Sequence, residues 1–306
     1  MTRISDLLGS GTTVSFEFFP PQDDQEKERL ERTIRDLEPL APSFVSVTYR
    51  GGRRSRLRTT EVVRNLLQER RVTAMPHLTC VAHSRAELVE IIGDFKNAGV
   101  SNVLALGGDP LPDGEQHELR HAVELVELAR SLGVDAIGVA AHPAGHPNSP
   151  DLASDRRYLA EKLGLADFAI TQFFFAADEY ESLVDDLDRL GIRKPVIPGI
   201  MPITNLGQIQ RMAQLSGCAV PGDVVAKLQR ADGNPEEVRR IGLELAVELC
   251  QSLLDRGAPG LHFYTLNTST ATREIHRQLK ISRPRVIDGL RDDGLGNSKP
   301  NVDTSP

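Results

Sequence analysis

The stretch TVSFEFFPPQ, residues 13–22, decides the fold class, because it contains the first strand and the turn that follows it. Residues 13–19 are rich in β-branched and aromatic residues, which predicts a strand. Residues 23–39 carry Leu, Glu and Arg at helical spacing, which predicts a helix. The turn between them, Phe19-Pro20-Pro21-Gln22, contains no glycine. An open sheet that binds a dinucleotide usually has a glycine-rich turn here, so this sequence disfavours that fold.

The same alternation of strand and helix continues along the chain. Further strands are predicted at 43–49, 72–80, 102–108, 135–143, 168–175, 195–202 and 260–266, and helices at 59–70, 84–99, 118–132, 151–164, 178–190, 204–216, 221–229, 235–256 and 268–279. Several strands are apolar almost throughout, which is typical of parallel strands covered on both faces. Eight strands, each followed by a helix, predict an α/β fold, a single (βα)₈ TIM barrel over residues 1–281. Residues 282–306 are polar and are predicted to form a flexible tail.

The composition excludes several classes of protein. A net charge of -7 argues against a nucleic-acid or anionic-membrane partner. The first residues contain no apolar run typical of a signal peptide, and no stretch approaches the length of a membrane span. Cys80, Cys218 and Cys250 are far apart and show no metal-binding spacing. We therefore expect a cytoplasmic protein that acts on small molecules without a metal ion.

In such a barrel the active site lies at the carboxyl ends of the strands. The residues predicted at these ends are Glu17, Thr48, His77, Asp109, His142, Gln172, Gly199 and Tyr264. Seven of these eight carry a side chain that can donate or accept a hydrogen bond. A ring of polar groups at one mouth suits a polar heteroaromatic ligand.

Glu17 is the strongest candidate for a catalytic residue. It lies between Phe16 and Phe18, and alternate residues of a barrel strand face the interior, so Glu17 is expected to point into the mouth. Apolar surroundings favour the protonated form of a carboxyl group, which would suit a general acid. The alternative is a buried glutamate that pairs with a basic residue for structural reasons.

Two other strand ends have a functional and a structural interpretation. Asp109 follows Gly107 and Gly108, and its carboxylate can accept hydrogen bonds from an amino-substituted ring or face a cofactor. Asp109-Pro110 is also an ordinary turn sequence. Gln172 offers a donor and an acceptor to the edge of a ring, or it is satisfied by the backbone.

Two further segments carry potential ligand-binding groups. His142 and His146 suggest a metal pair, but the neighbouring prolines and the lack of an acidic ligand at fixed spacing disfavour it. Residues 50–58 contain five arginines. They form either a solvated loop or a clamp for phosphates or carboxylates over the barrel mouth.

The motifs of the chain resemble those of the methylenetetrahydrofolate reductase family. They are SFEFFPP (15–21), FVSVTY (44–49), PHLTC (76–80), LALGGDP (104–110), GVAAHPAGHP (138–147), ITQFFF (170–175), IPGIMPITN (197–205) and HFYTLN (262–267). They run in order over roughly residues 13–280. The resemblance implies a (βα)₈ barrel of one-carbon metabolism. Such an enzyme would reduce 5,10-methylenetetrahydrofolate to 5-methyltetrahydrofolate with NADH or NADPH, usually through bound FAD.

The resemblance also implies roles for individual residues. Glu17 resembles the acid that protonates the folate nitrogen as the five-membered ring opens to an iminium. Asp109 resembles a carboxylate that contacts the pterin and tunes the flavin. Gln172 resembles the residue that binds the pterin. Gln208 matches a residue near the folate tail, and Tyr264 is expected to bind substrate. The expected cofactor-binding residues are Thr48, His77, Gly108, Asp109, Ala140, His142, His146, Asp155, Tyr158 and Lys162.

The chain departs from the family at five positions near the expected ligands. Gly107, Glu161 and Thr268 stand where the family usually has a basic residue, and His142 and Met212 stand where an aromatic residue is common. The first two changes remove positive charge from near the flavin phosphates.

Several interpretations therefore stay open. The resemblance makes FAD the expected carrier of the hydride, and Arg156, Arg157 or the Arg53–Arg58 cluster would have to replace the lost charge to hold it. Without flavin, the hydride would pass directly from the nicotinamide to the substrate. The barrel could also be a non-catalytic folate- or flavin-binding partner subunit, or reduce another pterin or a small imine. A homo-oligomer is compatible with the resemblance.

Overall fold

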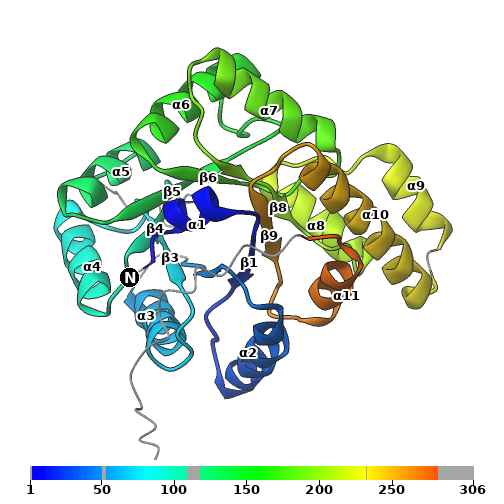
Figure 1. Ribbon diagram of the computed structural model, residues 1–306, viewed down its shortest axis with the longest axis horizontal. Helices are drawn as coiled ribbons and strands as arrows, with labels where there is room; N and C mark the ends of the chain where they lie inside the picture. The colour runs from blue at the N-terminus through cyan, green and yellow to red at the C-terminus, as the bar shows by residue number, and fades with distance from the viewer. Residues whose placement is uncertain (1, 50–52, 109–117, 232, 282–306) are drawn as a thin grey trace, which may run out of the picture.

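Parallel strands form the centre of the molecule, and helices surround them (Figure 1). The computed structural model describes residues 2–49, 53–108, 118–231 and 233–281, with only the backbone of 53–55. The strands are β1 (Thr13–Phe18), β2 (Phe44–Val47), β3 (Ala74–Thr79), β4 (Asn102–Leu106), β5 (Ala136–Ala141), β6 (Phe168–Thr171), β7 (Val196–Ile197), β8 (Gly199–Ile200) and β9 (Gly260–Tyr264). They pair in the order β7-β6-β5-β4-β3-β2-β1-β9-β8.

The barrel closes through a strand that is split in two. β7 pairs with β6, and β8 pairs with β9. Only Pro198 separates β7 from β8, and proline has no N–H group to donate to a sheet. Its carbonyl still accepts the N–H of His262 at 3.0 Å. The nine segments therefore occupy eight strand positions, and the predicted α/β barrel of eight strands is confirmed.

The helices follow the predicted order. They are α2 (Asp24–Leu37), α3 (Arg53–Gln68), α4 (Arg85–Asn97), α5 (Ala122–Ser131), α6 (Leu152–Leu165), α7 (Ala177–Arg189), α8 (Leu206–Ser216), α9 (Gly222–Arg230), α10 (Pro235–Asp255) and α11 (Thr270–Gln278), with a short 3-10 turn at Glu38–Leu40. Ser84 and Glu87 form a reciprocal capping box at the start of α4. None of the described helices combines the length and apolar character that a membrane crossing needs.

Two predicted boundaries were wrong, and one helix was missed. α3 begins at Arg53, six residues before the predicted start at 59, so the arginine-rich segment is partly helical. β6 ends at Thr171, because the chain turns away after Gln172 and buries Phe173 and Phe174 outside the sheet. The prediction also missed α1 (Ile4–Ser10). The predicted tail, 282–306, lies outside the described residues.

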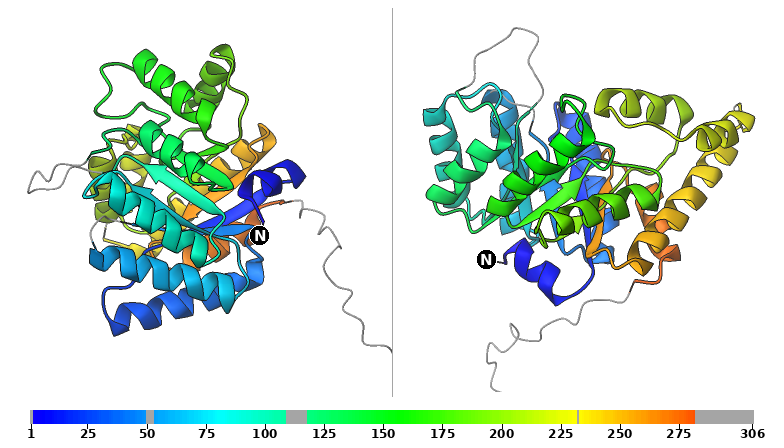
Figure 2. Two further views of the ribbon diagram at one scale, coloured as in Figure 1. Left: turned by 90° about the vertical axis from the view of Figure 1, so that its left-hand side faces the viewer. Right: turned by 90° about the horizontal axis from the view of Figure 1, so that it is seen from above.

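Helix α1 covers the amino-terminal end of the barrel. Ile4 and Leu8 pack against interior side chains of the strands, among them Phe44, Met75 and Phe168. The Oδ1 atom of Asn102 in β4 accepts the N–H of Ile4 at 2.8 Å, which fixes the helix to the sheet. The right-hand view of Figure 2 shows α1 at one end of the barrel and α8 towards the other. Apolar side chains of α1 and of the strands thus pack together at this end of the barrel.

Candidate active site

Glu17 lies inside the barrel, near the carboxyl end of β1. Its register partners are Ser46 in β2 and Tyr264 in β9. The neighbouring Phe16 and Phe18 pack into the core between the sheet and the helices. Because successive side chains of a strand alternate, Ser15 and Glu17 share the interior face. Glu17 is 6% exposed.

Two imidazole rings flank the Glu17 carboxyl group. Its Oε2 atom lies 3.4 Å from Nε2 of His77 and 3.7 Å from Nε2 of His262. Burial lowers the pKa of His77, the negative charge of Glu17 opposes this shift, and His262 adds to it. The Nε2 atom of His77 has no hydrogen-bond partner in the described part of the chain. The Glu17 carboxyl group thus meets two imidazole rings rather than the lysine or arginine of a structural ion pair.

A second polar layer lies beneath Glu17 and is centred on His262, which is fully buried. The Nδ1 atom of His262 is 2.8 Å from Oγ of Ser15, and its Nε2 atom is 3.3 Å from Oγ of Ser46. The ring stacks on Phe44 with centroids 5.9 Å apart. Sequence reasoning missed Ser15, Ser46 and His262. Strand alternation could have found two of them, since Ser15 is two residues before Glu17 and His262 two before Tyr264.

Tyr264 spans the neighbouring strand β8. Its hydroxyl donates to the carbonyl of Thr171 at 2.6 Å. A Cβ atom on Gly199 would lie 2.2 Å from that carbonyl and 2.6 Å from the tyrosine ring, so only glycine leaves room for this contact. Burial, and secondly the charge of Glu17, raise the pKa of Tyr264. The phenol is therefore neutral, and its hydroxyl is committed to the backbone.

The two glutamines expected to bind substrate lie after neighbouring strands. Gln172 follows β6, where its N–H donates to Ala141 at 2.7 Å and its Oε1 accepts the N–H of Phe173 at 3.0 Å. Its side-chain amide N–H groups make no hydrogen bond to another side chain of the described residues and can serve a ligand. Gln208 is exposed in the first turn of α8, and its Oε1 atom lies 3.4 Å from Oγ1 of Thr204.

A polar cluster forms where β5 leads into α6. The rings of His142 and His146 meet edge to face, with centroids 4.7 Å apart. Oδ1 of Asp155 accepts the N–H of His146 at 3.0 Å, and Nζ of Lys162 donates to the carbonyl of Ala140 at 2.7 Å. Burial lowers the pKa of Lys162 to about 8 and, with the nearby His146 and Lys162, that of His142 to about 4. The structure thus brings together five of the residues expected to bind a cofactor.

Arg156 and Arg157, two of the arginines considered as replacements for the lost charge, bind other groups of the protein. Arg156 is buried, and its guanidinium donates to the carbonyls of His142 at 2.9 Å and Pro143 at 2.6 Å. Its Nε atom donates to Asp186 at 3.3 Å. Arg157 is exposed and donates to Ser154 at 2.9 Å. Arg156 therefore stabilises the loop after β5, and these backbone contacts argue against a role for it as a phosphate ligand.

The remaining expected site residues have varied surroundings. Thr48 is buried after β2, and its Oγ1 atom has no partner among the described residues. Gly108 has φ +88, and a Cβ atom there would lie 2.3 Å from Val81, so the chain requires glycine. Tyr158 is 56% exposed on α6. Asp109 lies outside the described residues.

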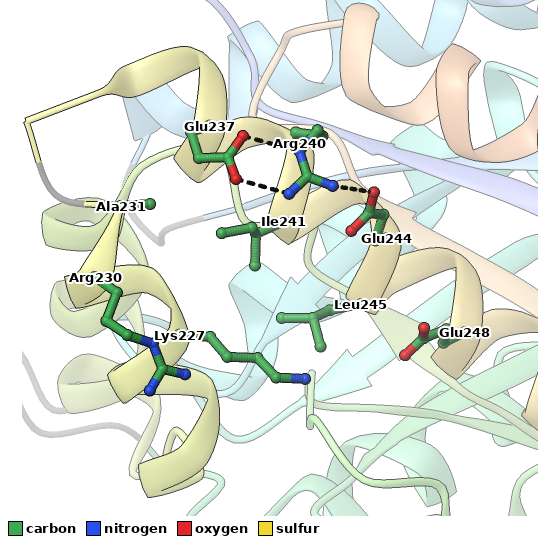
Figure 3. A pocket seen from close by; sticks show the side chains of 9 residues that line it. All are labelled: Lys227, Arg230, Ala231, Glu237, Arg240, Ile241, Glu244, Leu245 and Glu248. Atoms are coloured by element: carbon green, nitrogen blue, oxygen red, sulfur yellow. Dashed lines mark hydrogen bonds and ion pairs between the residues drawn. The ribbon is translucent and has the colours of Figure 1, made fainter.

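A cavity of about 400 Å³ lies elsewhere, between α9 and α10. Figure 3 shows the residues that line it: Lys227, Arg230, Ala231, Glu237, Arg240, Ile241, Glu244, Leu245 and Glu248. Arg240 bridges Glu237 and Glu244 on its α10 wall. The cavity contains none of the strand-end residues, so it is separate from the site around Glu17. In the described part of the chain, no three His, Cys, Asp or Glu side chains are grouped as metal ligands.

Comparisons with known proteins agree with the motifs and with the barrel. The family described as "Methylenetetrahydrofolate reductase" matches residues 3–280. A protein of Pectobacterium carotovorum named "5,10-methylenetetrahydrofolate reductase" is 35% identical over 274 residues, which is 89% of this chain and 91% of that protein. The Escherichia coli protein of the same name is 34% identical over 88% of this chain and 90% of its own length.

Two further similarities are more limited. One covers only part of a longer protein, and the other concerns the fold alone. A Caenorhabditis elegans protein named "Probable methylenetetrahydrofolate reductase (NADPH)" is 33% identical, and the match covers 89% of this chain but 43% of that protein. A solved Clostridium thermocellum structure, described as binding two copies of 5-methyl-5,6,7,8-tetrahydrofolic acid, has a TM-score of 0.63 at 11% identity. The match covers 90% of this chain and 96% of that one. At such low identity the likeness shows a shared barrel fold.

Proposed function

The chain belongs to the methylenetetrahydrofolate reductase family, and from this membership we propose that it reduces 5,10-methylenetetrahydrofolate to 5-methyltetrahydrofolate with NADH or NADPH. The observation that carries the proposal is the Glu17 carboxyl group, buried inside the carboxyl half of the barrel between two histidines. A proton donor held away from water, at the end where barrels bind their ligands, is what opening of the folate ring requires.

In the proposed reaction, Glu17 donates its proton to the folate nitrogen that leaves the methylene bridge. The five-membered ring opens, and the methylene carbon remains on the other nitrogen as an iminium. The C4 hydride of the dihydronicotinamide then adds to this carbon, which gives the methyl group and the oxidised nucleotide. The Glu17 carboxylate regains a proton from solvent before the next turnover. Gln172 is proposed to hold the pterin edge, because its side-chain amide N–H groups remain available after β6.

The surroundings of α6 argue against a flavin dinucleotide held through its diphosphate. Lys162 is the cation on the face of α6 that carries Asp155, and its ammonium group already donates to a backbone carbonyl. The adjacent Glu161 is exposed and negative, and Gly107 has no side chain to offer. Each lost charge-assisted hydrogen bond costs about 1.5–3 kcal/mol. We therefore propose that the hydride passes directly from NADH or NADPH to the iminium, and no step is assigned to FAD.

The visible absorption spectrum of the purified protein tests this route. A colourless protein that forms 5-methyltetrahydrofolate, at a rate unchanged by added FAD, would support direct transfer. Initial rates against both substrates should then give intersecting double-reciprocal lines. Tightly bound flavin at one equivalent, with parallel lines, would contradict direct transfer and leave the reductase proposal intact.

The same assay separates the enzyme from a non-catalytic binding barrel. The purified protein is supplied with 5,10-methylenetetrahydrofolate and with NADH or NADPH, in the presence and absence of FAD. Formation of 5-methyltetrahydrofolate supports the reductase. No product in any combination, with folate binding retained, would favour a partner subunit.

A further inference from the structure

The second polar layer around His262 has a consequence for the proton on Glu17. We propose that His262 is a positioning residue for Glu17, and that Ser15 fixes the tautomer of its ring so that an unprotonated nitrogen faces the carboxyl group. This arrangement keeps the proton on Glu17 until the substrate takes it. The inference rests on the proposed role of Glu17 as the acid.

The first step of the argument is the hydroxyl group of Ser15. Its Oγ atom lies 3.2 Å from the carbonyl oxygen of Leu261, which can only accept, and we infer that the hydroxyl donates there. The same oxygen lies 2.8 Å from Nδ1 of His262. Because its only hydrogen is already used, Ser15 can only accept from the ring. The hydrogen between them therefore belongs to Nδ1 of His262.

The second step follows from the chemistry of imidazole. A neutral ring that carries its hydrogen on Nδ1 has a bare lone pair on Nε2. That atom lies 3.3 Å from the Ser46 hydroxyl, which donates to it, and 3.7 Å from Oε2 of Glu17. A nitrogen without hydrogen at this distance has nothing to donate to a carboxylate and tolerates a carboxylic acid. The opposite tautomer would point an N–H group at Oε2 and would stabilise the carboxylate.

The other groups around the Glu17 carboxyl group do not supply a charge that would determine whether it is protonated. In the described part of the chain, the titratable groups facing Glu17 are His77 from β3 and His262 and Tyr264 from β9. Burial lowers the pKa of His77 and raises that of Tyr264, so both are neutral near neutral pH. β2 contributes only the hydroxyl of Ser46. With no charged side chain beside the Glu17 carboxyl group, the position of the N–H group on the His262 ring strongly influences whether this carboxyl group keeps its proton.

Ser15→Ala tests the proposal, with Ser46→Ala as a matched control that removes the other hydroxyl from the same ring. Without Ser15 the ring can place its hydrogen on Nε2 and donate to the Glu17 carboxylate. The basic limb of the pH profile of kcat/KM for the folate should then move to lower pH by about 0.5–1 unit. Ser46→Ala leaves Nε2 bare, so its limb should coincide with that of the wild type. Coincidence of all three profiles, or an equal shift in both variants, would overturn the proposal.

A second measurement does not depend on the variants or on activity. Nitrogen-15 shifts and couplings of labelled histidine report which ring nitrogen carries hydrogen, and the His262 signals are assigned through contacts with Phe44 and Ser15. We expect His262 to carry its hydrogen on Nδ1. A hydrogen on Nε2 would refute the inference even if the protein is an active reductase. A wild-type protein without folate turnover would instead refute the proposed function and leave this measurement valid.

Discussion

Nε2 of His77 lies 3.4 Å from Oε2 of Glu17, and both side chains are buried inside the barrel. The contact joins β1 to β3, which are not neighbours in the sheet. It therefore crosses the interior of the barrel above the hydroxyl of Ser46 in β2. Glu17 thus contacts a side chain of a strand that is not its neighbour in the sheet.

Glu17→Gln should abolish folate reduction and leave the fold intact. The amide has nearly the same shape but cannot donate a carboxylic proton, so kcat should fall by a factor of about 10²–10⁴. The measurement is 5-methyltetrahydrofolate formation in a single turnover with NADH or NADPH. Glu61→Gln, at an exposed position on α3, is the control and should keep wild-type turnover. Turnover by Glu17→Gln near the wild-type rate would disprove the acid role.

Lys162→Met should stabilise the protein at pH 7 and weaken nucleotide binding. The folded-state pKa of Lys162, about 8, lies below its ordinary value of 10.5, so the folded state binds its proton less tightly than the unfolded state. Its burial therefore costs stability in full below pH 8, and this cost fades as the pH rises to about 10.5. The variant should gain about 1–2 kcal/mol at pH 7, and the gain should shrink at pH 10.

Denaturant unfolding at the two pH values measures the effect of Lys162→Met. Lys227→Met, on the outer helix α9, is the control and should show no such pH dependence. Equal gains at pH 7 and pH 10 would contradict the lowered pKa. A rise in KM for NADH or NADPH in Lys162→Met would support contact between the ammonium group and the nucleotide.

His142→Phe should make the protein less sensitive to acid. Burial lowers the pKa of His142 from 6.5 to about 4, so the unfolded state binds a proton more readily. Stability is therefore lost as the pH falls from about 6.5 towards 4. Phenylalanine cannot titrate, and the variant should retain about 1–2 kcal/mol more stability than the wild type at pH 4.5 relative to pH 7.5. The check is the difference in Tm between the two proteins at both pH values. An unchanged difference would rule out this contribution.

Gly199→Ala should destabilise the barrel, whereas Gly93→Ala should not. A Cβ atom at 199 would approach the Thr171 carbonyl to 2.2 Å and the Tyr264 ring to 2.6 Å. The resulting strain should cost about 1–3 kcal/mol and displace the tyrosine hydroxyl. At Gly93, in α4, nothing lies within 4 Å, and alanine should add about 0.5–1 kcal/mol. Thermal unfolding compares the two variants. A Gly199→Ala protein as stable as the wild type would show that the Tyr264 contact is not a tight constraint.

The sequence by itself determined the barrel and the direction of Glu17. The strand and helix periods alternate clearly enough to give eight strand positions, and a period of two residues places Glu17 opposite the core-facing Phe16 and Phe18. These features depend on local spacing alone, as does the capping box of Ser84 and Glu87. Local spacing did not reveal the short helix α1, whose stability depends on contacts with Asn102 and the barrel interior.

Only the tertiary structure decided which polar groups are available to a ligand. Arg156 reads as a free cation in the sequence, but it is committed to the carbonyls of His142 and Pro143. The contact of Ser15 with His262 exists only because the first and last strands pair when the barrel closes. Buried polar groups must find partners within the protein, and closure of the barrel determines which partners are in reach. The fold thus follows from local patterns, whereas the chemistry of the mouth depends on distant residues that closure brings together.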